Sequence, residues 1–326
     1  MSLTADPSAP PLGTNAGRSR KPGRSAAELI FAVALPGACI VFLALFAGVA
    51  ISLAWGARLS MARFGLPFLW HSEWNPVTSQ FGALPFIYGS VVTSAIALLL
   101  ALLVGIPSGI FLAEFAPRRL AGPLGFLIEM LAAVPSVVYG LWGLFVLAPA
   151  VSGWIGPALQ DTLGFLPIFQ GTIYGVNLFT ASLILALMIV PVITAIVRDL
   201  IAAIPGPNRE AALALGATRW EAVRYVMLPA IRSGVFGASM LALGRALGET
   251  IATTMVIGNR PAISASLFAP GYTVSSVIAN EFTEATTNIY LSALLELGFI
   301  LLLVSVIVNG VGRGLLHLMI SEGQKT

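Results

Sequence analysis

The chain alternates between long apolar segments and shorter polar connections. The apolar segments are roughly 28–55, 86–116, 124–148, 177–198, 233–258 and 288–312. A helix needs about 20 apolar residues to cross about 30 Å of hydrocarbon, and each segment is long enough. The pattern therefore predicts an all-α polytopic membrane protein with six transmembrane helices.

The composition excludes a water-soluble globule. Of 326 residues, 57% are hydrophobic and 10% are charged, whereas about 25% are charged in ordinary soluble domains. The mean hydropathy is +0.93. Cys39 is the single cysteine, and His71 and His317 are far apart in sequence, so neither an intramolecular disulfide nor a metal site is predicted.

Residues 1–26 differ in composition from the rest of the chain. They are rich in Pro, Ser, Gly and Ala and end in a basic stretch, which predicts a disordered cytoplasmic tail whose basic end meets anionic membrane lipid. Residues 27–326 are predicted to form one transmembrane domain. The segment 28–55 exceeds the about 7–15 apolar residues of a signal peptide, which favours a retained anchor over a cleaved signal.

Basic residues are distributed unevenly between alternate connections. Thirteen Lys and Arg residues fall in the N-terminal tail, the second and fourth connections and the C-terminus, against three in the other connections: Arg58, Arg63 and Arg260. Because cytoplasmic loops carry the excess of positive charge, both termini are predicted to be cytoplasmic.

The sequence lacks the motifs of an energy-converting or hydrolytic enzyme. It contains no Gly-Lys dipeptide, and hence no phosphate-binding P-loop, and neither a G-x-S-x-G nor an H-E-x-x-H motif. We therefore expect a non-catalytic chain that depends on another subunit for energy, and no nucleic-acid partner.

The fourth connection, residues 205–229, predicts two short helices on the cytoplasmic side. Pro205 should end the preceding helix, Asn208 can cap a new one, and Gly216 should break it. Thr218 and Glu221 have the spacing of a capping box.

Pro229 is expected to close the second of these helices. The small residues Ala211, Ala212 and Gly216 leave a shallow surface for a partner, with Glu210 and Arg219 as polar contacts. The alternative is an amphipathic connector that rests on the membrane.

The fifth apolar segment contains two charged residues, Arg245 and Glu249. Because they are four residues apart, they are predicted to lie on one helix face, where they can touch. An isolated charge at the bilayer centre costs about 2.5–3.5 kcal/mol on insertion scales, so such residues face the bundle interior or a watery cavity. Arg245 can bind an anion that Glu249 partly neutralises, or the pair can simply lock the helix to its neighbours.

Other acidic residues lie in or near the apolar segments. Glu129 precedes Pro135, which frees a backbone carbonyl that Ser136 or Tyr139 could bond, and packing at a kink is the competing explanation. The remaining expectations are helix–helix hydrogen bonding of Glu296 with Ser292 or Asn309, and a surface ion pair of Glu114 with Arg118.

The fourth connection resembles the signature cytoplasmic loop of ABC importer permeases, E-A-A-x3-G-x9-I-x-L-P. The matching residues are Glu210-Ala211-Ala212, Gly216, Val226 in place of Ile, and Leu228-Pro229. From about residue 70 to residue 316 the chain is similar to the PstC-type permeases of phosphate-specific ABC importers, through FGALPFIYGSVVTS, AAVPSVVYGLWGLFVLAP, LFTASLILALMIVP, GRALGETIATTMVIGN and SSVIANEFTEA.

This resemblance implies the type I ABC importer permease fold, with its core at about 86–316 and an ATPase-coupling loop at 205–229. It implies a substrate pathway at Arg245, Glu249, Ser136 and Tyr139. The implied contacts with the ATPase are Glu210, Ala211, Ala212, Gly216 and Arg219.

The partners implied are a homologous second permease, two copies of an ATP-binding subunit and an extracytoplasmic phosphate-binding protein. ATP and Mg would be bound by the ATPase and no cofactor by this chain. Glu73, Glu281 and Glu284 in the outside loops could contact the binding protein, or simply be solvated. The alternatives are a sulfate or molybdate permease and a non-transporting membrane sensor or scaffold.

Overall fold

A computed structural model of the chain describes residues 26–323. Within them the structure is helical apart from turns, loops and one isolated β-bridge between Asn75 and Gln80. Six helical stretches are long and apolar enough to cross a membrane: Phe31–Phe64, Leu84–Phe115, Ser136–Leu163, Leu178–Ala202, Arg219–Gly248 and Asn288–Leu316. The prediction of an all-α protein with six spans is confirmed, while the predicted tail, apart from Ala26, lies outside the described residues.

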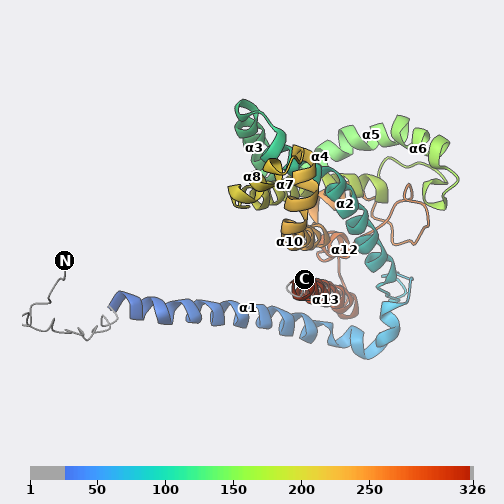
Figure 1. The fold of residues 1–326 in the computed structure, drawn as a ribbon. Coiled ribbons are helices and arrows are strands. Elements are labelled where there is room, and N and C mark those ends of the chain that lie inside the picture. Colours follow the sequence, from blue (N-terminus) through green and yellow to red (C-terminus); the bar gives the residue numbers. More distant parts are fainter. Residues whose placement is uncertain (1–25, 324–326) are drawn as a thin grey trace, which may run out of the picture. The chain divides into compact units, whose positions relative to one another are not determined.

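The elements carry the labels of Figure 1. The helices are α1 Ala26–Phe64, α2 Leu84–Ile110, α3 Arg118–Ala133, α4 Ser136–Trp142, α5 Ala148–Ala150, α6 Gly156–Leu163, α7 Leu178–Ala202, α8 Gly206–Ala214, α9 Arg219–Ala222, α10 Leu228–Gly248, α11 Ile251–Val256, α12 Val274–Glu281 and α13 Asn288–Gly323. Short 3-10 turns occur at Leu66–Leu69 and Pro167–Phe169, and π-helical turns at Phe111–Phe115, Gly143–Leu147, Val151–Ile155 and Val223–Met227.

The chain divides into two compact units, residues 1–49 and 50–326. In the first unit the described residues form the N-terminal part of α1, and its apolar side chains from Phe31 to Val49 are exposed. An all-apolar exposed helix is suited to hydrocarbon as its solvent. All the other elements belong to the second unit.

The core of the second unit forms where α2 packs along α7, with α10 beside them. Small residues permit a close approach: a Cβ added at Gly109 would lie 2.8 Å from the carbonyl oxygen of Thr194. Ala101, Ile193 and Ala242 are fully buried in this cluster. Small residues at helix contacts are typical of membrane bundles, where close backbone approach replaces the hydrophobic driving force.

The third span does not run where the apolar pattern placed it. The predicted segment 124–148 crosses the end of α3 at Ala133, an extended Val134 and Pro135, and the span begins at Ser136 and continues to Leu163. Pro135 cannot donate a backbone hydrogen bond, and it forces the residue before it out of the helical region. The apolar pattern did not reveal this break, because the residues of α3 before it are also apolar.

Three other prolines do not end their helices. Pro149, Pro157 and Pro229 each follow a π-helical turn by two residues. A proline has no N–H to donate to the carbonyl four residues before it. In each case that carbonyl lies inside the wider π-helical turn. The expectation that Pro229 closes a helix is therefore wrong, and α9 continues through the π-helical turn into α10 as one span.

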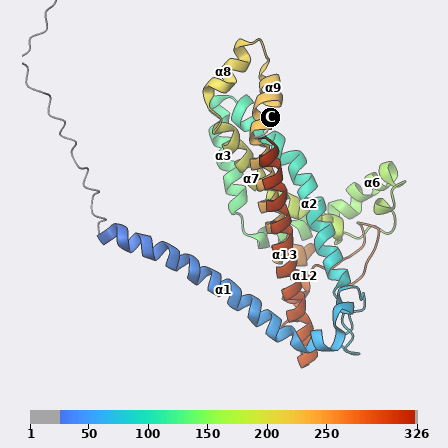
Figure 2. The same cartoon turned by 60° about the horizontal axis from the view of Figure 1, so that its bottom comes forward.

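The two ends of the second unit differ in what they carry. Figure 2 shows α8 and α9 at one end, whereas α12 and the segment that joins α1 to α2 lie towards the other. The C-terminal part of α1 is fastened to α13 within this unit, since the Ser60 backbone N–H donates to the Ser292 hydroxyl at 3.0 Å. That hydroxyl donates in turn to the Gly56 carbonyl at 2.7 Å.

Candidate functional site

The helix that carries Arg245 ends three residues later. α10 stops at Gly248, and Glu249 has an extended backbone with φ −69° and ψ 129°. Arg245 and Glu249 therefore do not share a helical face, and the predicted contact between them is wrong. Among the described side chains, ion pairs join Arg198 with Glu129 and Asp199, and Arg209 with Glu114, and none of these includes Arg245 or Glu249.

Arg245 is exposed in this chain although it lies in a membrane-spanning helix. Tyr139 lies on α4, which packs on α11, since a Cβ added at Gly140 would lie 3.1 Å from the Cα of Ala252. α11 follows two residues after α10, the helix that carries Arg245. The helix with Tyr139 therefore packs on the element that comes directly after the Arg245 helix.

Tyr139 also repairs the break at Pro135. Its hydroxyl donates to the Leu131 carbonyl at 2.8 Å, and Leu131 is four residues before the proline. This is the carbonyl that Pro135 leaves without its usual donor, so the expected hydrogen bond at this kink is present. Ser136, the other predicted pathway residue on this element, is the first residue of α4.

Glu249 is held at the start of α11. Its Oε1 accepts from the backbone N–H of Ala252 at 3.3 Å, and its backbone carbonyl accepts from the Ser275 hydroxyl at 2.8 Å. Ser275 lies on α12, whose N-terminus is capped by Thr273. The sequence analysis did not single out Ser275, and only the run of Thr and Ser at 273–276 hints at it.

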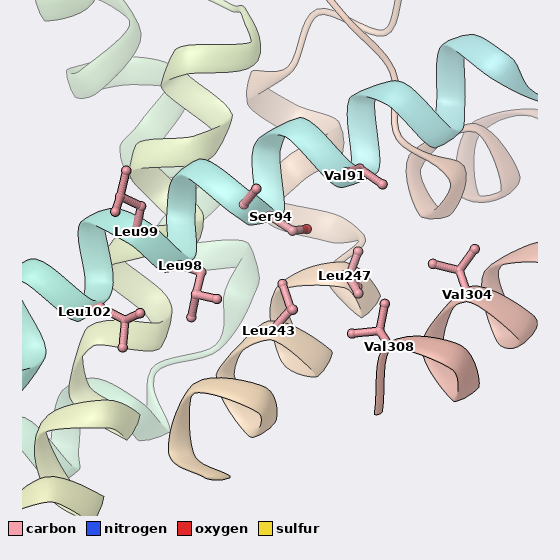
Figure 3. A pocket seen from close by; sticks show the side chains of 10 residues that line it. Val91, Ser94, Leu98, Leu99, Leu102, Leu243, Leu247, Val304 and Val308 are labelled. Carbon is pink, nitrogen blue, oxygen red and sulfur yellow. The ribbon is translucent and has the colours of Figure 1, made fainter. Parts of the chain in front are cut away.

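An apolar cavity of about 330 Å³ lies on another side of α10. Figure 3 shows Leu243 and Leu247 of α10 pointing into it together with Ser94 of α2 and Val304 and Val308 of α13. Arg245 is two residues from each of these leucines. On a helix with 3.6 residues per turn, its side chain is therefore about 200° around the helix axis from theirs. The cavity therefore lies away from Arg245, and its apolar lining does not suit an anion.

The predicted coupling loop forms a helix with two faces. α8 begins at Gly206 after Pro205, so Asn208 lies inside the helix and is not its cap. Ala212 is 8% exposed and faces the bundle, whereas Glu210 and Ala211 are exposed. Small and acidic residues on the outward face leave room for a partner.

Gly216 ends α8 in a left-handed conformation with φ +89°. The Gly216 N–H donates to the Leu213 carbonyl at 3.0 Å and the Ala217 N–H to the Ala212 carbonyl at 3.2 Å. These two bonds make a Schellman motif, which uses glycine because other residues are strained at positive φ. The predicted helix break at Gly216 is confirmed.

The helix that follows starts with the predicted capping box. The Glu221 N–H donates to the Thr218 hydroxyl oxygen at 3.3 Å, and the Thr218 N–H donates to Glu221 Oε2 at 2.7 Å. Arg219 is exposed beside it. The side chains of Leu215 and Trp220, which the sequence analysis left out, are 89% and 53% exposed.

The acidic residues near the membrane edges have partners that differ from those expected. Glu129 on α3 pairs with Arg198 on α7 at 2.9 Å. Glu114 was expected to pair on the surface with Arg118, but its side chain is 3% exposed and pairs with Arg209 on α8 at 2.6 Å. The π-helical turn that contains Glu114 lets its side chain turn into the protein.

Glu296 does not make the hydrogen bonds that we expected. Ser292 donates to the Gly56 carbonyl and Asn309 to the Ser305 carbonyl, so both use nearby backbone groups instead. The Oε2 atom of Glu296 is buried and has no hydrogen-bond partner in the part of the chain that the structure describes. It lines an apolar cavity of about 500 Å³ between α1 and α13.

Glu281, expected to contact a soluble partner, is occupied within the chain. Its Oε2 accepts from the Trp74 indole at 2.8 Å and from the Tyr290 hydroxyl at 2.6 Å. Beside it, burial raises the pKa of Tyr272 to about 12, so that phenol stays neutral at physiological pH. Glu73 and Glu284 are exposed, in keeping with either expectation for them.

Six apolar spans, an intramembrane arginine at a helix break and an exposed helical loop define a membrane permease subunit. The family described as the binding-protein-dependent transport system inner membrane component matches residues 105–318. A phosphate transport system permease protein PstC from Mesorhizobium japonicum is 47% identical over 89% of this chain and 90% of its own length. PstC from Pasteurella multocida is 46% identical over 88% of this chain and 91% of its own. The chain belongs to this family of transport permeases, in its PstC group.

Solved structures agree on the fold. A bacterial ABC transporter that imports the acidic polysaccharide alginate has a TM-score of 0.56 and 16% identity, and the match covers 87% of this chain and 95% of that one. The MetNI methionine ABC transporter, in an inward-facing conformation, has a TM-score of 0.53 at 15% identity over 71% and 93% of the two chains. The fold is that of an ABC importer permease. As a member of the PstC group, the chain is a multi-pass, non-catalytic membrane subunit of an ABC transporter complex.

Proposed function

We propose that the chain is the permease subunit of an ATP-driven importer of inorganic phosphate. The observation that carries the proposal is Arg245, an exposed cation at the end of a membrane-spanning helix in a chain of the PstC group. A charge in a span faces protein or water and not lipid. Arg245 therefore faces a surface that a second subunit or a watery path covers.

The chemistry of this place suits an oxyanion. A guanidinium carries a permanent charge and five N–H donors that can replace the water around phosphate. Glu249 holds the start of α11 and does not neutralise Arg245 by direct contact. Conduction requires a site that binds but also releases, and Ser136 and Tyr139 would complete its wall.

The second part of the proposal concerns the complex. A homologous permease covers the Arg245 side, so that the pathway runs between the two chains. Two ATPase subunits bind ATP and Mg, and one of them docks on Glu210, Ala211, Gly216 and Arg219. The exposed side chains of Leu215 and Trp220 would add apolar contacts to this docking surface.

The third part concerns orientation. α8 and α9 lie on the cytoplasmic side together with both termini, in keeping with the excess of basic residues there. An extracytoplasmic binding protein delivers phosphate to the other end. ATP-driven closure of the ATPases moves α8 and reorients the spans, which exposes the pathway alternately to each side.

The test is labelled phosphate uptake in a strain that lacks its own high-affinity phosphate importer. The strain expresses this chain with its neighbouring permease, ATPase and binding protein, and excess sulfate or molybdate is the competitor. Saturable uptake that neither competitor reduces supports the proposal. Uptake that sulfate or molybdate erases identifies a permease for that other oxyanion. The absence of uptake from an assembled complex favours a sensor or scaffold.

A further inference from the structure

α8 contacts the bundle through an arginine that the family signature does not include. Arg209 and Ala212 are three residues apart and share the inward face of α8, opposite the exposed Glu210 and Ala211. Arg209 Nη2 lies 2.6 Å from Glu114 Oε1. This ion pair joins α8 to the end of α2, although 95 residues separate the two in sequence.

The pair is unlike the other ion pairs of the described chain. The side chain of Glu114 is 3% exposed, whereas those of Glu129 and Asp199, which pair with Arg198, are 54% and 68% exposed. Among the described side chains, the contact with Arg209 is the one interaction of the buried Glu114 Oε1. The Glu114 carboxylate therefore depends on Arg209, because a buried carboxylate without its cation is strongly unfavourable, whereas the Arg209 side chain is 39% exposed.

No loop joins α8 to α2. α8 is covalently connected to α7 on one side and to α9 and α10 on the other. α2 has no such connection, yet it packs along α7 and forms the centre of the bundle. The Arg209–Glu114 pair is a direct contact between α8 and the end of α2.

The other end of α2 contacts the elements around Glu249. The Ser90 hydroxyl oxygen of α2 accepts from the Val274 backbone N–H of α12 at 2.9 Å. The next residue, Ser275, donates to the Glu249 carbonyl at 2.8 Å. α2 thus contacts the inward face of α8 near one end and, through α12, the segment between α10 and α11 near the other.

We infer that the Arg209–Glu114 pair is the link that makes α2 move together with α8. This inference rests on the proposed importer function and deepens it. Arg209 and Glu114 are positioning residues in it: neither touches the transported anion, and their effect on transport is exerted through the position of α2. Such coupling is demonstrated by comparing two conformations of the complex, because proximity of two residues does not demonstrate it.

The first test measures the distance between α8 and α2 and needs no substrate. Spin labels are attached at Ala214→Cys on α8 and at Leu103→Cys on α2, both exposed, in a Cys39→Ser background. We expect the distance in the assembled complex to be the same with and without a non-hydrolysable ATP analogue. In Glu114→Gln it should change when the analogue is added. A distance that changes in the unmutated pair, or one that stays fixed in Glu114→Gln, overturns the inference.

The second test measures phosphate uptake per ATP hydrolysed. We expect Glu114→Gln and Arg209→Gln to lower this ratio by about tenfold, the order of a typical coupling between sites, while the complex still co-purifies. Arg209→Lys should restore part of it. Glu129→Gln, which removes an exposed pair, is the matched control and should leave the ratio unchanged.

The double variant Glu114→Gln with Arg209→Gln separates a link from a folding contact. It leaves no unpaired buried charge, so a purely structural role predicts recovery. The inferred link predicts a ratio as low as in the single variants, and recovery overturns it. If the unmutated complex takes up no phosphate, the proposed substrate fails, whereas the spin-label distances still decide the link.

Discussion

Arg209 and Arg245 lie on helices of the same half of the chain, but the protein surrounds them differently. Arg209 meets the buried carboxylate of Glu114 at 2.6 Å. Arg245 is exposed, and the ion pairs of the described side chains that involve Arg198 and Arg209 do not include it. One arginine is tied to its own chain, and the other is directed away from the packed core.

The difference shows how one residue type serves two purposes. A guanidinium paired with a buried carboxylate fixes the position of a helix, because separating the charges leaves the carboxylate uncompensated. A guanidinium that the chain does not neutralise keeps its charge and donors for a ligand. The helix end at Gly248 produces the second situation, because it turns Glu249 away from the face of Arg245.

The largest effect should come from giving Arg245 an internal partner. Leu241 is exposed one helical turn before Arg245, and a Glu four residues N-terminal to a cation is well placed to pair with it. We expect Leu241→Glu to lower phosphate uptake by about tenfold to a hundredfold, because the new carboxylate competes with the anion for the guanidinium and a hydrogen bond to a charged group contributes about 1.5–3 kcal/mol. Leu241→Gln is the control. Equal uptake by the two variants would show that a carboxylate next to Arg245 does not impair transport.

At the coupling end, Gly216→Leu should weaken ATPase binding. A residue with a Cβ is strained at φ +89° by about 1–2 kcal/mol, so α8 loses its ordered end. Affinity measured with the purified ATPase should fall by roughly 5–30-fold. Gly206→Leu, at the start of the same helix, has open space and serves as the control. Unchanged binding by Gly216→Leu would count against the docking surface.

A third carboxylate, Glu281, is satisfied by neutral donors instead of an arginine. Glu281→Ala leaves the Trp74 indole and the Tyr290 hydroxyl without their acceptor. An unsatisfied buried donor costs about 1–3 kcal/mol, so the apparent Tm of the purified complex should fall. Glu284→Ala removes an exposed carboxylate nearby and should leave Tm unchanged. Equal Tm values for the two variants would mean that the cluster contributes nothing to stability.

The smallest effect is expected at the capping box. Thr218→Ala removes the oxygen that accepts from the Glu221 N–H, and an N-cap contributes about 1 kcal/mol. Amide hydrogen exchange over residues 219–222 should accelerate about fivefold, as that free energy implies. Exchange elsewhere in the protein should not change, and a global acceleration would show that the cap supports more than the local helix.

Much of the fold follows from local sequence. The spans are visible because hydrocarbon demands long apolar runs, and the Thr218 capping box and the Gly216 helix end depend on residues a few positions apart. Pro135 illustrates the limit, because its freed carbonyl was foreseen but the complete break into α3 and α4 was not. Pro229 was expected to end a helix, but the preceding π-helical turn lets the helix continue past it. The local sequence did not indicate this turn.

The site was less predictable because it depends on distant contacts. Arg245 and Tyr139 could be named as pathway residues, but the position of α4, which carries Tyr139, depends on its packing on α11. The same holds for Glu114 and Arg209, since 95 residues separate the partners. The Arg245–Glu249 contact was expected from helical spacing, and it failed because the helix ends between them.

The most direct test of the account is phosphate transport by Arg245→Gln in proteoliposomes that contain the whole complex, its binding protein and ATP. Arg260→Gln, which removes a charge outside the spans, is the control. We predict that Arg245→Gln assembles and hydrolyses ATP but accumulates phosphate no faster than liposomes without ATP, while Arg260→Gln transports normally. Phosphate accumulation by Arg245→Gln at the rate of the unmutated complex would contradict the account.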